Sequence, residues 1–298
     1  MVENSALVGY GDWGKIVMRY IVPENGFLLK KIFSRTCNEN EMFTTSLENI
    51  ANDSEISVVF LTTPIETHVE LVEYFVCHGK HVFCEKPLSC DYKKTCELVD
   101  YAEKVNKVLF VDYTFCYSPS ILKIRELISL LGEIRHVDAE FLQFGKFYDD
   151  NVLSVIGIHW IAVMKMLLKK QIKVKDIKAD YYINGHPNYI CAEYETDTYT
   201  INLRANLLSS NKYRRIILYG NDGTLVYDTS ASNTISLIQF DNNVKKKELY
   251  FNFDENNNLR NSVRYFKNII DGESNLVDIK DTEHLLYDSI SFLGVSGK

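Results

Sequence analysis

No stretch of this 298-residue chain is apolar for long enough to cross a membrane, since a spanning helix needs about 18 to 20 such residues. The first residues, Met1-Val2-Glu3-Asn4, also lack the basic region and hydrophobic segment of an export signal. A strand-like run follows them almost at once. The sequence therefore predicts a cytoplasmic protein without a membrane partner.

An excess of basic residues is missing too. The chain has 33 Lys and Arg against 40 Asp and Glu, a net charge of −7. A surface that binds nucleic-acid phosphates needs the opposite balance, so no nucleic-acid partner is predicted. The basic run Lys245-Lys246-Lys247 is interpreted as a solvated strand edge.

The cysteines show no pairing pattern. There are seven, an odd number, and no two form a Cys-x-x-Cys pair. This usage is typical of reduced thiols, and we predict no metal site. Cys84 lies in an apolar run and is expected to be a packed thiol rather than a nucleophile.

A glycine-rich turn near the start of the chain points to a nucleotide. The run Ala6-Leu7-Val8 leads into Gly9-Tyr10-Gly11-Asp12-Trp13-Gly14, and a helix is predicted from Trp13 to Tyr20. The pattern Gly-x-Gly-x-x-Gly between a strand and a helix is the dinucleotide fingerprint, although the bare pattern is weak evidence. Gly9, Gly11, Asp12, Trp13 and Gly14 are therefore candidate cofactor-binding residues.

A second signal lies at Glu85-Lys86-Pro87, directly after the apolar run His81-Val82-Phe83-Cys84. Proline cannot continue a strand ladder and keeps the residue before it extended, so Lys86 is predicted in a turn at the carboxyl edge of a parallel sheet. Ligands of open α/β sheets bind at that edge. The alternative is an ordinary solvated turn lysine.

Together these segments resemble the glucose-fructose oxidoreductase and inositol dehydrogenase family, often written Gfo/Idh/MocA. The resemblance rests on the glycine turn, Thr62-Thr63-Pro64 followed by His68, Glu85-Lys86-Pro87, and Gly157-Ile158-His159. It implies that the glycines hold NAD or NADP and that Lys86 lies near the nicotinamide and substrate. It places Thr62, Thr63, Pro64 and Glu85 against the cofactor, while His68 is equally well interpreted as a surface histidine.

The same resemblance implies catalytic roles for Lys86 and His159, although His159 on its own is more often a satisfied core histidine. The family's aspartate, four residues before the histidine, is replaced by Val155. The segments from Val111 to Phe115 and from Tyr148 to Leu153 look like the branch associated with surface-polysaccharide sugars. Tyr113, Lys212 and Arg214 are candidate substrate contacts, and surface charge is the alternative for the last two.

The residues after the second predicted strand bear on the choice of cofactor. Strand 27–33 is followed by Ser34-Arg35-Thr36, without the acid that would bind the ribose hydroxyls of NAD. Arginine pairs well with the 2′-phosphate of NADP. The sequence favours NADP, with NAD as the alternative if Arg35 only stacks on the adenine.

The predicted fold is α/β, with a Rossmann dinucleotide-binding domain at residues 1–118 and an α+β domain at 119–298. In the second part, residues 198–207 alternate between apolar and polar, as in a sheet buried on one face. The resemblance implies a large, mainly antiparallel open sheet there, which joins a homodimer or homotetramer. The predicted function is hydride transfer between a nicotinamide and a sugar or sugar-nucleotide hydroxyl or ketone. The alternative, motivated by Val155, is a catalytically impaired dinucleotide-binding sensor or scaffold.

Overall fold

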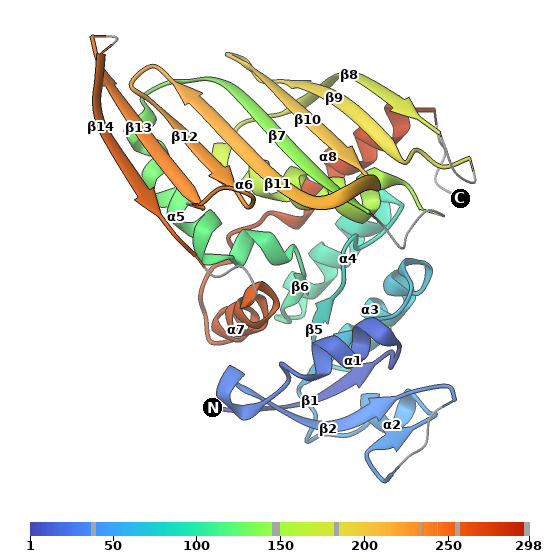
Figure 1. The fold of residues 1–298 in the computed structure, drawn as a ribbon. Coiled ribbons are helices and arrows are strands. Elements are labelled where there is room, and N and C mark those ends of the chain that lie inside the picture. The colour runs from blue at the N-terminus through green and yellow to red at the C-terminus, as the bar shows by residue number, and fades with distance from the viewer. Residues whose placement is uncertain are drawn as a thin grey trace. The chain divides into compact units, whose positions relative to one another are not determined.

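The computed structural model describes residues 1–36, 40–144, 150–181, 185–232, 234–242, 244–253 and 257–294. Tyr148 and Asp149 therefore lie outside the described residues. The chain forms two compact units, which are described separately (Figure 1). The first combines Met1–Thr114 with Asn257–Glu283, and the second combines Phe115–Asn256 with His284–Lys298.

The first unit contains a six-stranded parallel sheet in the order β3-β2-β1-β4-β5-β6. The strands β4, β5 and β6 are apolar and almost wholly buried, as in a doubly wound fold whose sheet has helices on both faces. Five strands of the sheet, β1, β2, β4, β5 and β6, are directly followed by Gly9, Ser34, Thr62, Glu85 and Asp112. These residues therefore share the carboxyl edge of the sheet. The strands are β1 (Glu3–Val8), β2 (Phe27–Phe33), β3 (Phe43–Thr44), β4 (Val58–Leu61), β5 (His81–Cys84) and β6 (Leu109–Val111).

Capping explains where two of the helices begin. The Asp91 carboxylate accepts hydrogen bonds from the backbone N–H groups of Lys93 and Lys94, which starts α4. Ser118 caps α5 in the second unit, where Pro119 occupies the first helical position. The helices of the first unit are α1 (Asp12–Met18), α2 (Glu48–Ala51), α3 (His68–Cys77), α4 (Tyr92–Lys104) and α7 (Asn258–Ile270).

Helix α7 comes from late in the chain, yet it completes the core of the first unit. Its Phe266 is fully buried, and its ring lies 5.4–5.8 Å from the rings of four strand phenylalanines: Phe27, Phe60, Phe83 and Phe110. The sequence-based division placed the domain boundary near residue 118 and residues 257–283 in the second domain. In the structure, the first stretch of the first unit ends at Thr114, and residues 257–283 belong to the same unit.

The second unit contains an eight-stranded sheet in the order β14-β13-β12-β11-β7-β10-β9-β8. All its neighbouring strands are antiparallel except β10 and β7, which are parallel. The predicted α/β fold, with a parallel Rossmann sheet and a second, mainly antiparallel sheet, is thereby confirmed. The strands are β7 (Ile134–Phe144), β8 (Lys173–Asp180), β9 (Tyr189–Glu195), β10 (Thr200–Asn206), β11 (Leu208–Gly220), β12 (Gly223–Asp228), β13 (Ile235–Asp241) and β14 (Val244–Phe251).

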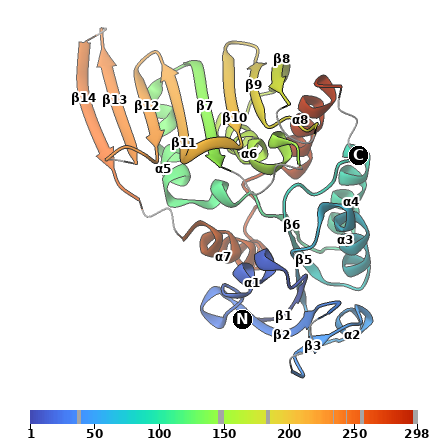
Figure 2. The ribbon, with the colours of Figure 1, turned by 45° about the vertical axis from the view of Figure 1, so that its right-hand side comes forward.

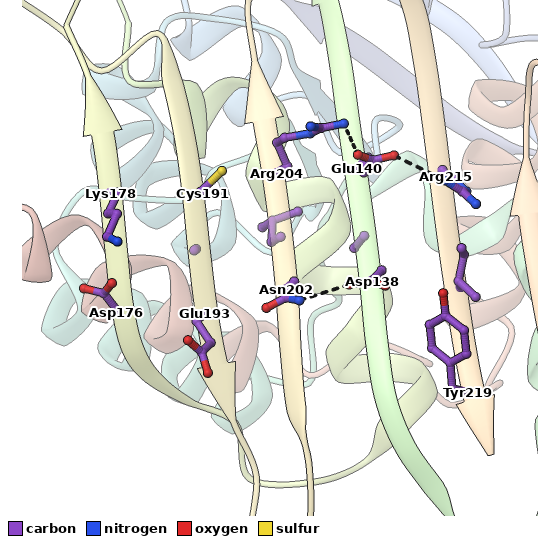
Figure 3. Close-up of a pocket in the computed structure, with 14 residues that line it drawn as sticks. Asp138, Glu140, Asp176, Lys178, Cys191, Glu193, Asn202, Arg204, Arg215 and Tyr219 are labelled. Carbon is purple, nitrogen blue, oxygen red and sulfur yellow. Dashed lines mark hydrogen bonds and ion pairs between the residues drawn. The ribbon is translucent and has the colours of Figure 1, made fainter. Parts of the chain in front are cut away.

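One face of this sheet is covered and the other is open. The side chains predicted to face inward from residues 199–207 are all buried: Tyr199, Ile201, Leu203, Ala205 and Leu207. Helices α5 (Pro119–Leu127), α6 (Ile158–Leu168) and α8 (Ile279–Phe292) lie on the covered side (Figure 2). The open face carries a pocket with charged walls, in which Arg204, Glu140 and Arg215 form ion pairs across three strands (Figure 3).

The segment that leads to His159 is not a regular α-helix throughout. Residues Leu153–Gly157 form a π-helical turn, and α6 begins only at Ile158. Such turns insert an extra residue into a helix and are frequent at functional sites.

None of the helices formed by the described residues combines the length and the apolar character that a membrane-spanning segment needs.

Candidate active site

The glycine turn after β1 has the geometry that a dinucleotide requires. Gly9 has a φ of +105°, and a Cβ there would lie 2.8 Å from the Thr62 carbonyl oxygen. A Cβ on Gly14 would lie 2.0 Å from the Gly9 carbonyl oxygen, so this close packing of turn and helix requires glycine. Gly11 differs from both, because a Cβ there would have no atom within 4 Å.

The open space beside Gly11 is where the fingerprint brings the backbone close to a pyrophosphate. The tight packing at Gly9 and Gly14 and the open side at Gly11 are therefore those of a dinucleotide turn. The residues present fit an NAD(P) cofactor.

The turn after β4 is tied to the glycine turn. The Thr62 hydroxyl donates a hydrogen bond to the Gly9 carbonyl oxygen at 2.7 Å. Thr63 and Pro64 follow, and the Thr67 hydroxyl lies 2.8 Å from that of Thr63. The two loops thus form one continuous surface at the carboxyl edge.

His68 links the same region to the lysine turn. It is buried at 1% exposure, with Nδ1 3.0 Å from the Pro87 carbonyl oxygen and Nε2 2.9 Å from that of Thr63. Burial lowers the pKa of His68, and the two backbone contacts oppose this effect. Both ring nitrogens are engaged with the backbone, so His68 holds the two turns together.

Ser34 and Arg35, which the sequence predicts to select the cofactor, directly follow β2. The Gly9 N–H donates to the Phe33 carbonyl oxygen, so this strand end adjoins the glycine turn. Ser34 is buried, and Arg35 is exposed. An exposed guanidinium at this edge is free of the packing constraints that would keep it from a phosphate.

Glu85 and Lys86 follow β5, and both are partly buried. The Trp13 indole N–H donates a hydrogen bond to Glu85, which joins the start of α1 to the lysine turn. Burial, followed by the nearby Asp112 charge, raises the pKa of Glu85 to about 8, while the Trp13 contact and Lys86 oppose this shift.

Two more carboxyl groups approach Lys86. Asp112 follows β6 and is fully buried, and Glu283 lies on α8 at 2% exposure. Burial raises the pKa of Asp112 to about 6 and that of Glu283 to about 7. The Lys86 charge acts on both in the opposite direction. Lys86 thus lies in the field of three carboxyl groups, each of which changes its charge near neutral pH.

Tyr113, predicted as a substrate contact, is fully buried, and its hydroxyl donates to Glu283 Oε1 at 2.7 Å. In this structure Tyr113 therefore orients a carboxylate. Sequence reasoning missed both Glu283 and Asp112. Glu283 could have been noticed as an acid on the apolar stripe of its helix, beside Ile279 and Leu286, and Asp112 as an acid directly after a buried strand.

In the second unit, His159 and Arg214 meet at an aromatic cluster. The His159 ring lies 4.9 Å from that of Phe115 and 5.8 Å from that of Phe141. The Arg214 guanidinium carbon lies 4.7 Å from the Phe115 ring centroid and 4.9 Å from that of Phe141. Two predicted substrate residues from different elements, α6 and β11, are therefore brought together on the same pair of rings.

The remaining predicted residues of this unit are placed differently. Lys212 is exposed on β11. Val155 lies in the π-helical turn, where its N–H donates to the Asn151 carbonyl oxygen. The side chain at this position is therefore apolar and cannot act as an acid or base.

Residues 4–113 match a family model described as an oxidoreductase family with an NAD-binding Rossmann fold, Gfo/Idh/MocA. Over these residues the chain is similar to this oxidoreductase family. A scyllo-inositol 2-dehydrogenase (NADP⁺) of Bacillus subtilis is 24% identical over 68% of this chain and 69% of its own length. A dTDP-3,4-didehydro-2,6-dideoxy-α-D-glucose 3-reductase of Streptomyces violaceoruber is 25% identical, over 41% of this chain and 39% of its own length.

Solved structures match the fold of the chain over nearly its whole length. A UDP-N-acetylglucosamine 3-dehydrogenase of Acidithiobacillus ferrooxidans has a TM-score of 0.83 at 17% identity, covering 98% of this chain and 97% of the other. An oxidoreductase domain protein of Kribbella flavida has a TM-score of 0.84 at 16% identity, covering 99% and 97%. At these identities the likeness establishes the fold alone.

Proposed function

We propose that this oxidoreductase uses NADP to transfer a hydride between the nicotinamide and a hydroxyl or ketone group of a sugar or sugar nucleotide. The observation that carries the proposal is the shared carboxyl edge, where the glycine turn, Thr62, Arg35 and Lys86 follow neighbouring strands of one sheet. Exposed Arg35, with no acid beside it in Ser34-Arg35-Thr36, supports NADP over NAD. Relatives that act on an inositol and on nucleotide-linked sugars support the substrate class.

When bound, the nicotinamide supplies or accepts the hydride. Lys86 performs the proton half of the reaction, because the substrate oxygen must lose or gain a proton as the carbon changes oxidation state. The Glu85 contact with Trp13 fixes the turn that carries Lys86. Arg214, held on Phe115 and Phe141, is suited to an anionic substituent such as a sugar carboxylate or a nucleotide phosphate. His159 packs against the same rings and contacts the substrate oxygen or its neighbour.

The open face of the eight-stranded sheet supports assembly into a homodimer or homotetramer. Its alternating acids and bases, including Asp138, Glu140, Arg204 and Arg215, offer a patterned surface for a second copy. Sedimentation measurements on the purified protein test this assembly.

Two measurements test the proposed function. Calorimetry should show tighter binding of NADPH than of NADH, and NADPH fluorescence should fall when the protein meets a matching keto-sugar from a panel of nucleotide sugars. Tighter binding of NADH would contradict the cofactor choice. Tight dinucleotide binding without turnover across the panel would favour the second candidate, a sensor or scaffold, for which the missing acid at Val155 is the supporting observation.

A further inference from the structure

The surroundings of Glu283 suggest a role that the proposed mechanism leaves unassigned. Its Oε1 accepts two hydrogen bonds, from the Leu88 backbone N–H at 2.9 Å and from the Tyr113 hydroxyl at 2.7 Å. Leu88 is two residues beyond Lys86, so the carboxyl group is anchored directly to the lysine turn. The other oxygen, Oε2, is buried and has no hydrogen-bond partner within the described part of the chain.

The other two carboxyl groups near Lys86 have hydrogen-bond donors of their own. Both Asp112 oxygens are bound, Oδ1 by the Ser262 hydroxyl of α7 and Oδ2 by the Thr114 hydroxyl at 3.0 Å. Glu85 Oε1 accepts from the Trp13 indole. A buried carboxylate oxygen without a donor is costly, and such an atom is commonly retained because it has a chemical task. Among the described residues, Glu283 Oε2 is thus the buried oxygen of this cluster that has no hydrogen-bond donor.

We propose that Glu283 is a positioning residue for Lys86 that also accepts the proton from its ammonium group. The proposal rests on the proposed function. In substrate oxidation the carbinol O–H bond breaks and an N–H bond forms on the neutral Lys86 amine, while the C–H electron pair leaves as hydride to the oxidised dinucleotide. The Lys86 ammonium then passes a proton to Glu283 Oε2, which restores the amine and leaves a carboxylic acid. Reduction runs the same transfers backwards.

The charges around Glu283 agree with this exchange. Burial raises the pKa of Glu283 to about 7, while the Leu88 N–H, the Tyr113 hydroxyl and the Lys86 charge oppose the shift. Both of its protonation states are therefore populated near neutrality, where proton transfer is most efficient. Glu85, Asp112, Tyr113 and His68, described above, are further titratable groups at this turn. Cys84 is another, and its fully buried thiol has a raised pKa.

The variant Glu283→Gln tests the proposal with little change in shape. Its amide oxygen can still accept from Leu88 and Tyr113, whereas the NH₂ group that replaces Oε2 cannot take a proton. Asp281→Asn is the matched control, because Asp281 lies on the same helix with an exposed side chain. Tyr113→Phe is the second variant, since it keeps Glu283 but removes a donor that stabilises its charged form.

The primary readout is the reactivity of Lys86 in the full chain without cofactor or substrate. Only the neutral amine reacts with acetic anhydride, so labelling of the Lys86 peptide from pH 6 to 10, followed by mass spectrometry, reports the lysine pKa. Glu283→Gln removes an anion beside the ammonium, so at pH 8 Lys86 should be labelled about tenfold faster, equivalent to one pKa unit. Tyr113→Phe should give an intermediate rate, and Asp281→Asn the native rate. Native labelling of Glu283→Gln at every pH would overturn the proposal.

The pH dependence of turnover is a second test, independent of the labelling experiment. The pH profile of kcat should lose or shift its ionisation near neutrality in Glu283→Gln, whereas a merely structural role would lower kcat evenly at every pH. An evenly lowered or native profile would overturn the proposal. Native turnover by Lys86→Ala would instead overturn the lysine mechanism itself, together with the relay that rests on it. The two failures are distinguishable, because the labelling experiment requires no substrate.

Discussion

The two compact units hold their predicted functional cations in different surroundings. Lys86, in the first, lies in the field of Glu85, Asp112 and Glu283, groups whose charges change near neutral pH. Arg214, in the second, lies on the faces of two phenylalanine rings. A lysine among titratable groups is suited to moving a proton, whereas a permanently charged arginine on apolar rings is suited to holding an anion. The difference separates chemistry from recognition and can be tested residue by residue.

The largest effect is expected from Lys86→Ala. Removing the proton-transfer group should lower turnover by roughly 100- to 10,000-fold, the usual contribution of general acid-base catalysis, while calorimetry shows nearly native NADPH affinity. Lys93→Ala, which removes an exposed lysine of α4, is the control. Turnover at the native rate would mean that the first unit does not supply the proton.

Arg214→Ala should act mainly on recognition. Loss of the guanidinium removes a charged contact worth a few kcal/mol, so KM for an anionic sugar substrate should rise by about 10- to 100-fold with a smaller change in kcat. Arg214→Lys should recover only part of the affinity, because an ammonium group neither stacks nor binds an anion in a bidentate manner. A loss confined to kcat would contradict the assignment of recognition to the second unit.

Within the first unit, Arg35→Asp separates cofactor selection from catalysis. The change removes a charge-assisted contact and repels a 2′-phosphate, so the ratio of NADPH to NADH affinity should fall by roughly 10- to 100-fold. The comparison requires dissociation constants for both dinucleotides. An unchanged ratio would indicate that Arg35 only stacks on the adenine.

The smallest predicted effect is on the pH dependence of stability. The folded-state pKa of Glu283 is raised above that of the unfolded chain, so between about pH 4.5 and 7 the folded state binds more protons and loses stability as pH rises. The lowered pKa of His68 acts in the opposite direction, so wild type must be compared with Glu283→Gln. Urea unfolding gives the free energy of unfolding of both proteins at each pH. Between pH 5 and pH 8, this free energy for Glu283→Gln minus that for wild type should rise by at least about 1 kcal/mol. A constant difference would contradict this expectation.

Features encoded by neighbouring residues were predictable from the sequence. The apolar runs of the parallel strands, the cap at Ser118 and the alternation of residues 199–207 each depend on a few adjacent side chains, and all appear in the structure. The α/β fold class follows from those local signals.

Features that depend on long-range partners were not predictable in the same way. Glu283 bonds to the backbone of Leu88, 195 residues earlier, and no periodicity reports such a meeting. The π-helical turn before α6 was missed as well, because one extra residue in an apolar stretch leaves the overall pattern helical. The roles predicted for His159, Lys212 and Arg214 came from resemblance, and they stay predictions.

The late arrival of Phe266 has a consequence for synthesis on the ribosome. Residues 1–114 emerge first, yet the ring that touches Phe27, Phe60, Phe83 and Phe110 emerges more than half a chain length later. Before α7 has been synthesised, the phenylalanine rings that Phe266 later contacts remain uncovered on the nascent sheet. Chaperones recognise apolar surfaces of this kind. The strands of the second unit are all translated before α7, so they can pair before the core of the first unit is complete.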